Sequence, residues 1–403
     1  MKNIYIIDES TSSKQNGIGT YIKELVSGMR GYAKTHIISF NSNHQFFKKE
    51  HTEVTTIYHI PCYCQGEFLN NPETALALLQ LEIPDTKGNV FIVNHYPASK
   101  IIMGLKSHFP LSKIVFVIHG QSWATALMGN ESLFRKLITN KRLNKIERSL
   151  SRQISVGFNE ECNIYRLADA VVTLTKETTR LLTDIYNIPR EKITEIPNGY
   201  HFIPVHFSKT KIRKSLCVEP TDKIILYAGR TTKLKGIDMI LKSFNDVVIR
   251  HPEAKLVIAG LIFRLNEFAN ICPRGISRVV FTGLLTKERL TDWFHVADIG
   301  LMFSFYEQCS YTGIEMLAHG IPVIASDAIG VKTMFQELNH SPLVHISDNE
   351  EQMKNNTTNA ICRLIESDKT TIQAIHDEEL KHYKRKFSAD SMVNKYISLI
   401  TSF

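Results

Sequence analysis

The sequence predicts an α/β protein made of two doubly wound, Rossmann-like domains that face each other across a cleft. Short runs of Val, Ile, Leu and Phe alternate with segments of helical period almost from end to end, as in parallel sheets built from βαβ units. The chain has 403 residues, a length that favours two hydrophobic cores over one. Because open parallel sheets bind ligands at the carboxyl ends of their strands, we expect the ligand in that cleft.

The first domain is expected to comprise residues 1–200. The turn signal Ile196-Pro-Asn-Gly199, followed by the polar stretch Ser208–Lys214, places the boundary between the domains. Apolar residues at helical spacing in Ala389–Phe403 predict a terminal helix. The expected strands of this domain are Ile4–Asp8, Thr35–Phe40, Val90–Asn94, Ile114–His119 and Ala170–Thr175.

The second domain is expected to span residues 201–387. Several of its strand-like runs end in glycine, and all are rich in the apolar residues of buried parallel strands. The expected strands are Ile224–Gly229, Leu256–Gly260, Val279–Gly283, Ile299–Phe303, Val323–Ser326 and Leu343–Ile346.

Composition and charge indicate which kinds of partner the chain binds and in which compartment it lies. The formal net charge of +8 and the pI near 9.0 suit phosphate-bearing or anionic lipid partners, whereas no interleaving of aromatic and basic residues indicates nucleic acid. The start lacks the features of a signal peptide, and no apolar run approaches ~18 residues. Seven scattered cysteines, including Cys62 and Cys64, match neither a disulfide framework nor a zinc motif. We expect a cytoplasmic protein, either free or peripheral at the inner face of the membrane.

Two carboxylates, Glu307 and Glu315, bracket a short polar loop between an apolar strand and a helix. A helix start presents backbone N–H groups that can bind an anion. The spot thus combines an anion cradle with two acceptors suited to sugar hydroxyls. Solvation of Glu307 and a helix-dipole contribution of Glu315 do not explain why both flank the same anion site. The backbone donors expected here belong to Ser310, Tyr311, Thr312 and Gly313.

Two cations follow the first strand of the second domain. Arg230 ends that strand, and Lys235 precedes Gly236 at the start of the next helix. At this strand end, the planar guanidinium of Arg230 and the compact ammonium of Lys235 could neutralise a diphosphate, whose negative charge grows as a glycosidic bond breaks. A solvated pair of turn charges is the alternative.

In the first domain, Gly17 and Gly19 open a helix after the first strand, where glycine lets backbone approach a phosphate closely. A tight turn without a ligand would use the same residues. A nicotinamide-binding fingerprint is rejected, because Ile22 stands where a third glycine is needed. His119 and His95 each end a strand-like run and could bind a sugar hydroxyl or a phosphate, or move a proton. Either histidine could instead be purely structural.

Residues 134–153 form a strongly basic segment of helical period, with seven cations and one acid, Glu147. An amphipathic basic helix of this kind can lie on anionic lipid. The same pattern also fits a solvated face that packs on its own domain. The cations are Arg135, Lys136, Lys141, Arg142, Lys145, Arg148 and Arg152, and the expected apolar side comprises Leu133, Leu137, Leu143, Ile146 and Leu150.

Taken together, these motifs resemble the GT-B glycosyltransferases, most closely the retaining glycosyltransferase family 4. The resemblance is strongest over Ile193–Val331 and thinner in the first domain. The ordered set is more specific than any single member. It comprises Ile196-Pro-Asn-Gly199, Tyr227-Ala-Gly-Arg230, Lys235-Gly236, Val257-Ile-Ala-Gly260, Phe281-Thr-Gly283, Ala297-Asp298, the two glutamates and Ala318–Ser326, preceded by Gly17/Gly19, Ile118-His-Gly120 and Val171–Thr175.

The resemblance implies a nucleoside diphosphate sugar, UDP- or GDP-linked, as co-substrate. Arg230 and Lys235 would bind its diphosphate, Glu307 its sugar and Glu315 its ribose, while the residues from Ser310 to Gly313 would offer N–H groups to the phosphates. The acceptor would be a saccharide, a lipid-linked saccharide or a peptide.

From the first domain, the resemblance implies that His119 contacts the donor sugar and that Gly17 and Gly19 lie by the diphosphate or acceptor. His95 is a weaker candidate for acceptor binding. The resemblance also implies that the terminal helix returns to the first domain, which would thereby include residues 388–403.

The chain departs from the family pattern after the first glutamate, where Gln308-Cys309-Ser310 replaces an aromatic residue and a glycine. No nucleophilic carboxylate stands out in the first domain, which suits a front-face retaining mechanism. With Arg and Lys available for the diphosphate and no Asp-x-Asp motif, neither a metal nor a cofactor is expected. Two alternatives stay open: a GT-B epimerase or phosphorylase, and a sugar-nucleotide-binding protein without turnover.

Overall fold

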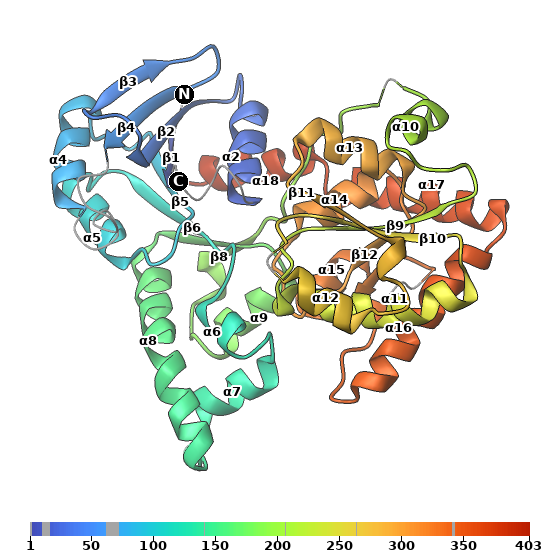
Figure 1. The fold of residues 1–403 in the computed structure, drawn as a ribbon. Helices are drawn as coiled ribbons and strands as arrows, with labels where there is room; N and C mark the ends of the chain where they lie inside the picture. Colours follow the sequence, from blue (N-terminus) through green and yellow to red (C-terminus); the bar gives the residue numbers. More distant parts are fainter. Residues whose placement is uncertain are drawn as a thin grey trace. The chain divides into compact units, whose positions relative to one another are not determined.

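The computed structural model divides into two compact units, coloured along the chain in Figure 1. It describes residues 2–9, 17–61, 72–140, 142–205, 207–262, 264–340 and 343–403. Unit 1 comprises residues 1–200 and 389–403, and unit 2 comprises residues 201–388. Residue 388, which the sequence analysis assigned to the first domain, therefore falls in unit 2. Cys62, Cys64 and Lys141 lie outside the described residues.

Unit 1 is built on an eight-stranded sheet of order β3-β4-β2-β1-β5-β6-β7-β8. Every neighbouring pair is parallel except β3 with β4, so β3 is an antiparallel edge strand. The central strands β1 and β5 are apolar and buried, as strands covered on both faces must be. The strands are β1 (Lys2–Glu9), β2 (Ala33–Ser42), β3 (Lys48–His51), β4 (Thr56–Pro61), β5 (Asn89–Val93), β6 (Lys113–Val117), β7 (Ala170–Thr173) and β8 (Ile193–Glu195).

The helices of unit 1 connect these strands, and the last helix of the chain joins them. That helix, α18 (Ala389–Thr401), lies beside α2 (Gly17–Gly28), and a hydrogen bond of 2.7 Å joins the hydroxyls of Tyr21 and Tyr396 in the core between them. The remaining helices are α4 (Glu73–Glu82), α5 (Ser99–His108), α6 (Ser122–Ala126), α7 (Glu131–Thr139), α8 (Lys145–Leu167), α9 (Lys176–Asp184) and the 3-10 turn η1 (Arg190–Lys192).

Unit 2 contains a six-stranded, wholly parallel sheet of order β11-β10-β9-β12-β13-β14. Its strands are β9 (Lys223–Ala228), β10 (Ala254–Ala259), β11 (Val279–Gly283), β12 (Ile299–Met302), β13 (Val323–Ser326) and β14 (Leu343–Val344). Its helices are α10 (Lys209–Ser215), α11 (Ile237–Arg250), α12 (Leu265–Ile271), α13 (Lys287–Val296), α14 (Tyr311–Ala318), α15 (Val331–Phe335), α16 (Glu350–Glu366) and α17 (Lys369–Lys386), with 3-10 turns η2 (Lys233–Lys235) and η3 (Ile276–Arg278). The predicted class, two doubly wound parallel sheets, is confirmed.

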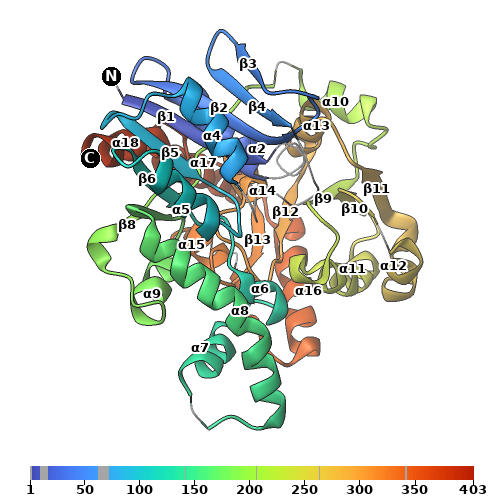
Figure 2. The ribbon, with the colours of Figure 1, turned by 90° about the vertical axis from the view of Figure 1, so that its left-hand side faces the viewer.

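Two features differ from the sequence analysis. Strands β3, β4 and β8 were not expected, and the basic segment 134–153 is not one helix. It breaks at Asn140, and α8 begins after Asn144, whose side chain accepts from Glu147 N–H while Glu147 reaches back in a capping box. Helix α7 and the first turns of α8 form a hairpin that projects from the rest of unit 1 (Figures 1 and 2). Within the described ranges, no helix is both long enough and apolar enough to cross a bilayer.

Candidate functional site

The candidate cations of unit 2 follow the carboxyl end of β9, where ligands of open parallel sheets bind. The Arg230 side chain is exposed and forms no ion pair with the residues that the structure describes. Its backbone is fixed, because the Tyr227 hydroxyl donates to the Arg230 carbonyl at 2.6 Å. The Arg230 guanidinium is thus available to donate two parallel hydrogen bonds to a phosphate, and the backbone that carries it is held in place.

Lys235 and Glu307 meet in an ion pair. Lys235 ends η2, and Glu307 lies in the loop after β12, the strand that pairs with β9. Their side chains are only 17% and 18% exposed, and the Ser304 hydroxyl lies 3.5 Å from Glu307 Oε1. In this low-exposure setting the pair is stronger than a surface salt bridge. The structure therefore joins two residues that the sequence analysis assigned to different parts of the ligand.

Two glycines allow this pair to form. Gly236 has φ +69°, and a Cβ there would lie 1.9 Å from the Phe303 carbonyl oxygen. Gly330 has φ +77°, and a Cβ there would lie 2.0 Å from the Glu307 carbonyl oxygen. Both contacts are closer than any side chain permits, so only glycine lets the turns carrying Lys235 and Glu307 approach their neighbours.

Glu315 on α14 is paired as well, with a lysine that the sequence analysis did not identify. Its side chain is 7% exposed and forms an ion pair with Lys287, the first residue of α13. Lys287 follows the strand end at Gly283 and the helix cap Thr286, a position where a side chain can reach the carboxyl edge of the sheet. This position after a strand end is the sequence signal by which Lys287 could have been identified. A ligand hydroxyl reaching Glu315 would therefore meet a carboxylate next to an ammonium.

At the start of α14, one of the expected backbone donors already has a hydrogen-bond partner in the helix cap. Ser310 is the N-cap, and its hydroxyl accepts from Gly313 N–H at 3.4 Å, so this N–H is already bound. Ser310 is partly exposed, whereas Gln308 and Cys309 are buried. The unusual pair Gln308-Cys309 thus faces the interior of unit 2, and Ser310 is the residue of this stretch that remains accessible.

In unit 1, His119 follows β6 and is held in one tautomer. Asn94 donates from Nδ2 to the Ile7 carbonyl at 3.4 Å, which turns its Oδ1 toward His119 Nε2 at 3.3 Å. Nε2 therefore carries the hydrogen and Nδ1 is left as an acceptor. Burial lowers the pKa of His119 to about 3, with a smaller contribution from His95. His119 is therefore neutral at physiological pH and suited to accept a hydrogen bond rather than to donate a proton.

The other candidates of unit 1 lie around the same strand ends. His95 Nε2 accepts from Glu9 N–H at 3.1 Å and lies 3.7 Å from Asp8 Oδ1. Gly17 and Gly19 occupy the first turn of α2, as expected. Tyr21, one turn later, places its ring against His119 at a centroid distance of 4.8 Å. The candidates of unit 1 thus cluster near His119, whereas in unit 2 Lys235 pairs with Glu307 and Lys287 pairs with Glu315.

Glu161 on α8 is a further positioning residue, which no sequence motif indicated. It is 1% exposed, its Oε1 accepts from Ser122 N–H at 2.5 Å, and its Oε2 accepts from the Tyr186 hydroxyl at 2.5 Å. The first of these bonds holds the chain just after His119. Burial raises the pKa of Glu161 to about 7, although both hydrogen bonds act in the opposite direction.

This raised pKa predicts a pH-dependent stability. Between about pH 4.5 and pH 7 the Glu161 carboxyl holds more protons in the folded state than in the unfolded state, so the contribution of Glu161 to the free energy of unfolding declines as pH rises through this window and is level above it. A shift of this size corresponds to about 3 kcal/mol. We expect Glu161→Gln to remove this decline, measured as the difference from the wild type in the change of unfolding free energy between pH 5 and pH 8, with denaturant unfolding at both values. Tyr186→Phe, which deletes a bond to the carboxylate, should extend the decline to higher pH. Equal pH dependence in all three proteins would contradict the assignment.

Two family models match the chain in consecutive segments. The model described as Glycosyltransferase Family 4 matches residues 15–201, and the model described as Glycosyl transferases group 1 matches residues 222–367. An uncharacterised glycosyltransferase of Methanocaldococcus jannaschii is 31% identical over 170 residues, 40% of this chain and 43% of that protein. The mannosylfructose-phosphate synthase of Agrobacterium fabrum is 29% identical over 200 residues, 45% of this chain and 43% of that protein. The matched region thus spans less than half the length of either relative.

Solved structures share the fold over the whole chain. The sucrose-phosphate synthase of Thermosynechococcus elongatus has a TM-score of 0.77 at 17% identity, with 100% of this chain and 99% of that chain covered. Anabaena HepE, solved with UDP and glucose, has a TM-score of 0.69 at 13% identity, with 100% of both chains covered. At these identities the likeness concerns the fold alone.

Proposed function

Since the chain belongs to the family 4 glycosyltransferases, we propose that it transfers a hexose-type sugar from a nucleoside diphosphate sugar to an acceptor, with retention of the anomeric configuration and without a metal. The acceptor would be a saccharide, a lipid-linked saccharide or a peptide. The observation that carries this proposal is the Lys235–Glu307 ion pair beside the exposed Arg230.

The pair explains how the site could accept a donor without burying an unpaired charge. Lys235 exchanges its carboxylate partner for a phosphate oxygen when the diphosphate arrives, and Arg230 binds a second oxygen. Glu307 is thereby released to accept hydrogen bonds from the hydroxyls of the sugar. The attraction between each cation and the leaving diphosphate increases as negative charge grows on it. This stabilises the transition state and speeds the reaction.

The reaction we propose needs no carboxylate nucleophile. The bond from the anomeric carbon to the diphosphate oxygen breaks, and the acceptor hydroxyl forms the new bond on the same face. The proton of that hydroxyl passes to the leaving phosphate oxygen. His119, neutral and with Nδ1 as an acceptor, would orient a sugar hydroxyl, and Glu315 would hold the ribose next to Lys287.

A uridine donor is our first choice. Among proteins with this fold, Anabaena HepE was solved with UDP, with UDP and glucose, and with UDP-glucose. This supports the proposal only as a likeness of fold, so GDP-sugars belong in the same test.

The test is a thermal-shift screen of UDP- and GDP-sugars followed by a nucleotide-release assay with mixed acceptors. A ligand that binds only the folded state raises the melting temperature, and transfer releases the nucleoside diphosphate only when an acceptor is present. Conversion of donor alone would identify an epimerase instead. Binding without release by any acceptor would overturn the proposal in favour of a protein without turnover.

We also propose that the α7–α8 hairpin contacts anionic membrane, which would suit a lipid-linked acceptor. Lys145, Arg148 and Arg152 are exposed, follow the i, i+3, i+7 spacing of one helix face, and form no ion pair with described residues. Ile146, expected on the packed side of a single helix, is instead 73% exposed beside them. By contrast, Arg135 and Lys136 on α7 pair with carboxylates of their own unit.

Vesicle flotation tests this contact. Each cation near an anionic surface contributes about 1 kcal/mol, so replacing these three cations by Gln should weaken binding to phosphatidylserine vesicles about 100-fold. The matched control replaces three other exposed cations of unit 1, Lys23, Arg30 and Lys34, with the same change in charge and little expected effect. Equal losses in both triple variants would show attraction by net charge alone, and no binding by the wild type would end the proposal.

A further inference from the structure

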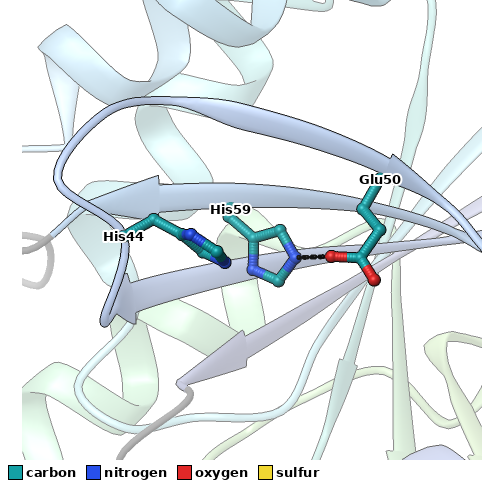
Figure 3. A group of neighbouring side chains, drawn as sticks. All are labelled: His44, Glu50 and His59. Atoms are coloured by element: carbon teal, nitrogen blue, oxygen red, sulfur yellow. Dashed lines mark hydrogen bonds and ion pairs between the residues drawn. The ribbon is translucent and has the colours of Figure 1, made fainter.

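A cluster of three metal-binding side chains lies in unit 1, at the edge of the eight-stranded sheet, and none of them takes part in the proposed transfer. His44 follows β2, Glu50 lies on β3, and His59 lies on β4. Figure 3 shows the His59 ring between the other two side chains, with one nitrogen directed at the Glu50 carboxylate. One ligand atom from each residue lies within 4.8 Å of the other two.

The strand register explains why Glu50 and His59 lie next to each other. In the antiparallel β3–β4 pair, Lys48 stands opposite His59. Glu50 lies two residues beyond Lys48 and therefore on the same face, diagonal to His59. Glu50 Oε2 is accordingly 3.1 Å from His59 Nε2. Because both residues belong to regular strands, their side chains are held in place by the sheet itself.

His44 completes the cluster from the segment between β2 and β3. Its ring meets the His59 ring edge-on, with a centroid distance of 4.4 Å and an interplanar angle of 62°. A tetrahedral zinc ion with bonds of about 2.0–2.2 Å separates its ligand atoms by about 3.4 Å. The three ligand atoms, at most 4.8 Å apart, can reach that spacing through side-chain rotation without movement of the strands.

We propose that His44, Glu50 and His59 bind a Zn²⁺ ion. Two imidazoles with one carboxylate are a zinc ligand set that leaves a fourth position for water, whereas Ca²⁺ and Mg²⁺ prefer oxygen ligands. The ion would tie the β2–β3 connection to the β3–β4 hairpin and so fix the edge of the sheet. The site is independent of the proposed transferase, because none of His44, Glu50 and His59 has a part in the proposed transfer.

The Lys48 ammonium would compete with a metal ion for the Glu50 carboxylate. Its Nζ lies 3.3 Å from the same Glu50 oxygen that contacts His59, and its side chain is half exposed and free to turn into solvent. A metal must displace this ammonium, since two cations cannot share one carboxylate oxygen without repulsion. Removing Lys48 should therefore strengthen metal binding at this site.

The experiment uses the full chain, stripped with a chelator and titrated with ZnCl₂ by calorimetry, with Co²⁺ absorption reporting tetrahedral geometry. We expect one tight equivalent, a higher melting temperature, and at least about tenfold weaker binding in His44→Ala and in His59→Ala, the loss that even outer partners of a metal cause. The matched control is His51→Ala, on β3 next to Glu50 but facing the other way and bonded to Thr56. This variant should bind Zn²⁺ like the wild type.

Lys48→Met keeps all three ligands and should bind Zn²⁺ more tightly than the wild type, which makes the proposal testable even if a histidine variant folds poorly. Equal affinity in the wild type, His44→Ala and His59→Ala would overturn it, as would unchanged or weaker binding by Lys48→Met. Because the probe is the metal alone, these results do not depend on finding the sugar donor.

Discussion

Lys235→Ala is expected to lower kcat about 10²-fold or more while the protein stays folded. Lys235 is the partly buried cation beside Glu307, and in the proposed reaction it stabilises charge that appears only as the diphosphate leaves. Loss of one such preorganised donor typically costs about 10²–10³ in kcat. Because the contribution is largest in the transition state, kcat and kcat/KM should fall together while KM changes little.

The same 3-10 turn supplies the control for this variant. Lys233 lies two residues earlier, is exposed, and forms no ion pair with described residues, so Lys233→Ala removes an equal charge without touching Glu307. It should retain near wild-type turnover. Arg230→Ala and Glu307→Ala should also lose about 10²-fold in kcat. Turnover at the wild-type rate in Lys235→Ala, Arg230→Ala and Glu307→Ala alike would overturn the site assignment.

Gly236→Ala is expected to destabilise unit 2 and to reduce activity at the same time. A left-handed residue other than glycine costs about 1–2 kcal/mol. The new Cβ would also lie 1.9 Å from the Phe303 carbonyl oxygen, and relief of such overpacking adds about 1–3 kcal/mol. The backbone must move to relieve it, and Lys235 moves with it. A displacement of this kind costs about 10² in rate when it occurs at a catalytic group.

Gly283, in the same unit, allows the cost of a left-handed backbone to be measured apart from the cost of steric overlap. Its φ is +68°, against +69° for Gly236, yet nothing lies within 4 Å of a Cβ built on it. Gly283→Ala should therefore show the conformational cost alone, about 1–2 kcal/mol. Denaturant unfolding and kcat measured on both variants provide the comparison. Equal destabilisation by the two substitutions would mean that the Phe303 contact yields freely and that Gly236 is not a constraint on Lys235.

The parts of the fold that were predicted are those whose signal is local and apolar. Buried strands such as β5 and β9 are continuous hydrophobic runs, and their nature follows from composition. The edge strand β3 is Lys-Lys-Glu-His, and charged residues are what an exposed sheet edge requires, so no hydrophobic pattern marked it. The break between α7 and α8 could have been predicted, because Asn144 and Glu147 have the spacing of a capping box.

The candidate site divides in the same way. Arg230, Lys235, Glu307 and Glu315 follow strand ends, so topology alone placed them near a ligand. Their partners depend on contacts between distant segments: Lys287 reaches Glu315 from another helix. The tautomer of His119 depends on an amide whose orientation is set by the Ile7 carbonyl. Such arrangements have no period or spacing in the chain and appear only once it is folded.

The pairing of α18 with α2 has a consequence for biosynthesis. Unit 2 is one continuous stretch, 201–388, whereas unit 1 is interrupted and regains residues 389–403 only afterwards. During synthesis the buried partner of Tyr21, the Tyr396 hydroxyl, therefore leaves the ribosome only after the whole of unit 2. The helix α18 of unit 1 is thus missing while the whole of unit 2 is made, so the packing of α18 on α2 can form only after unit 2 has been synthesised.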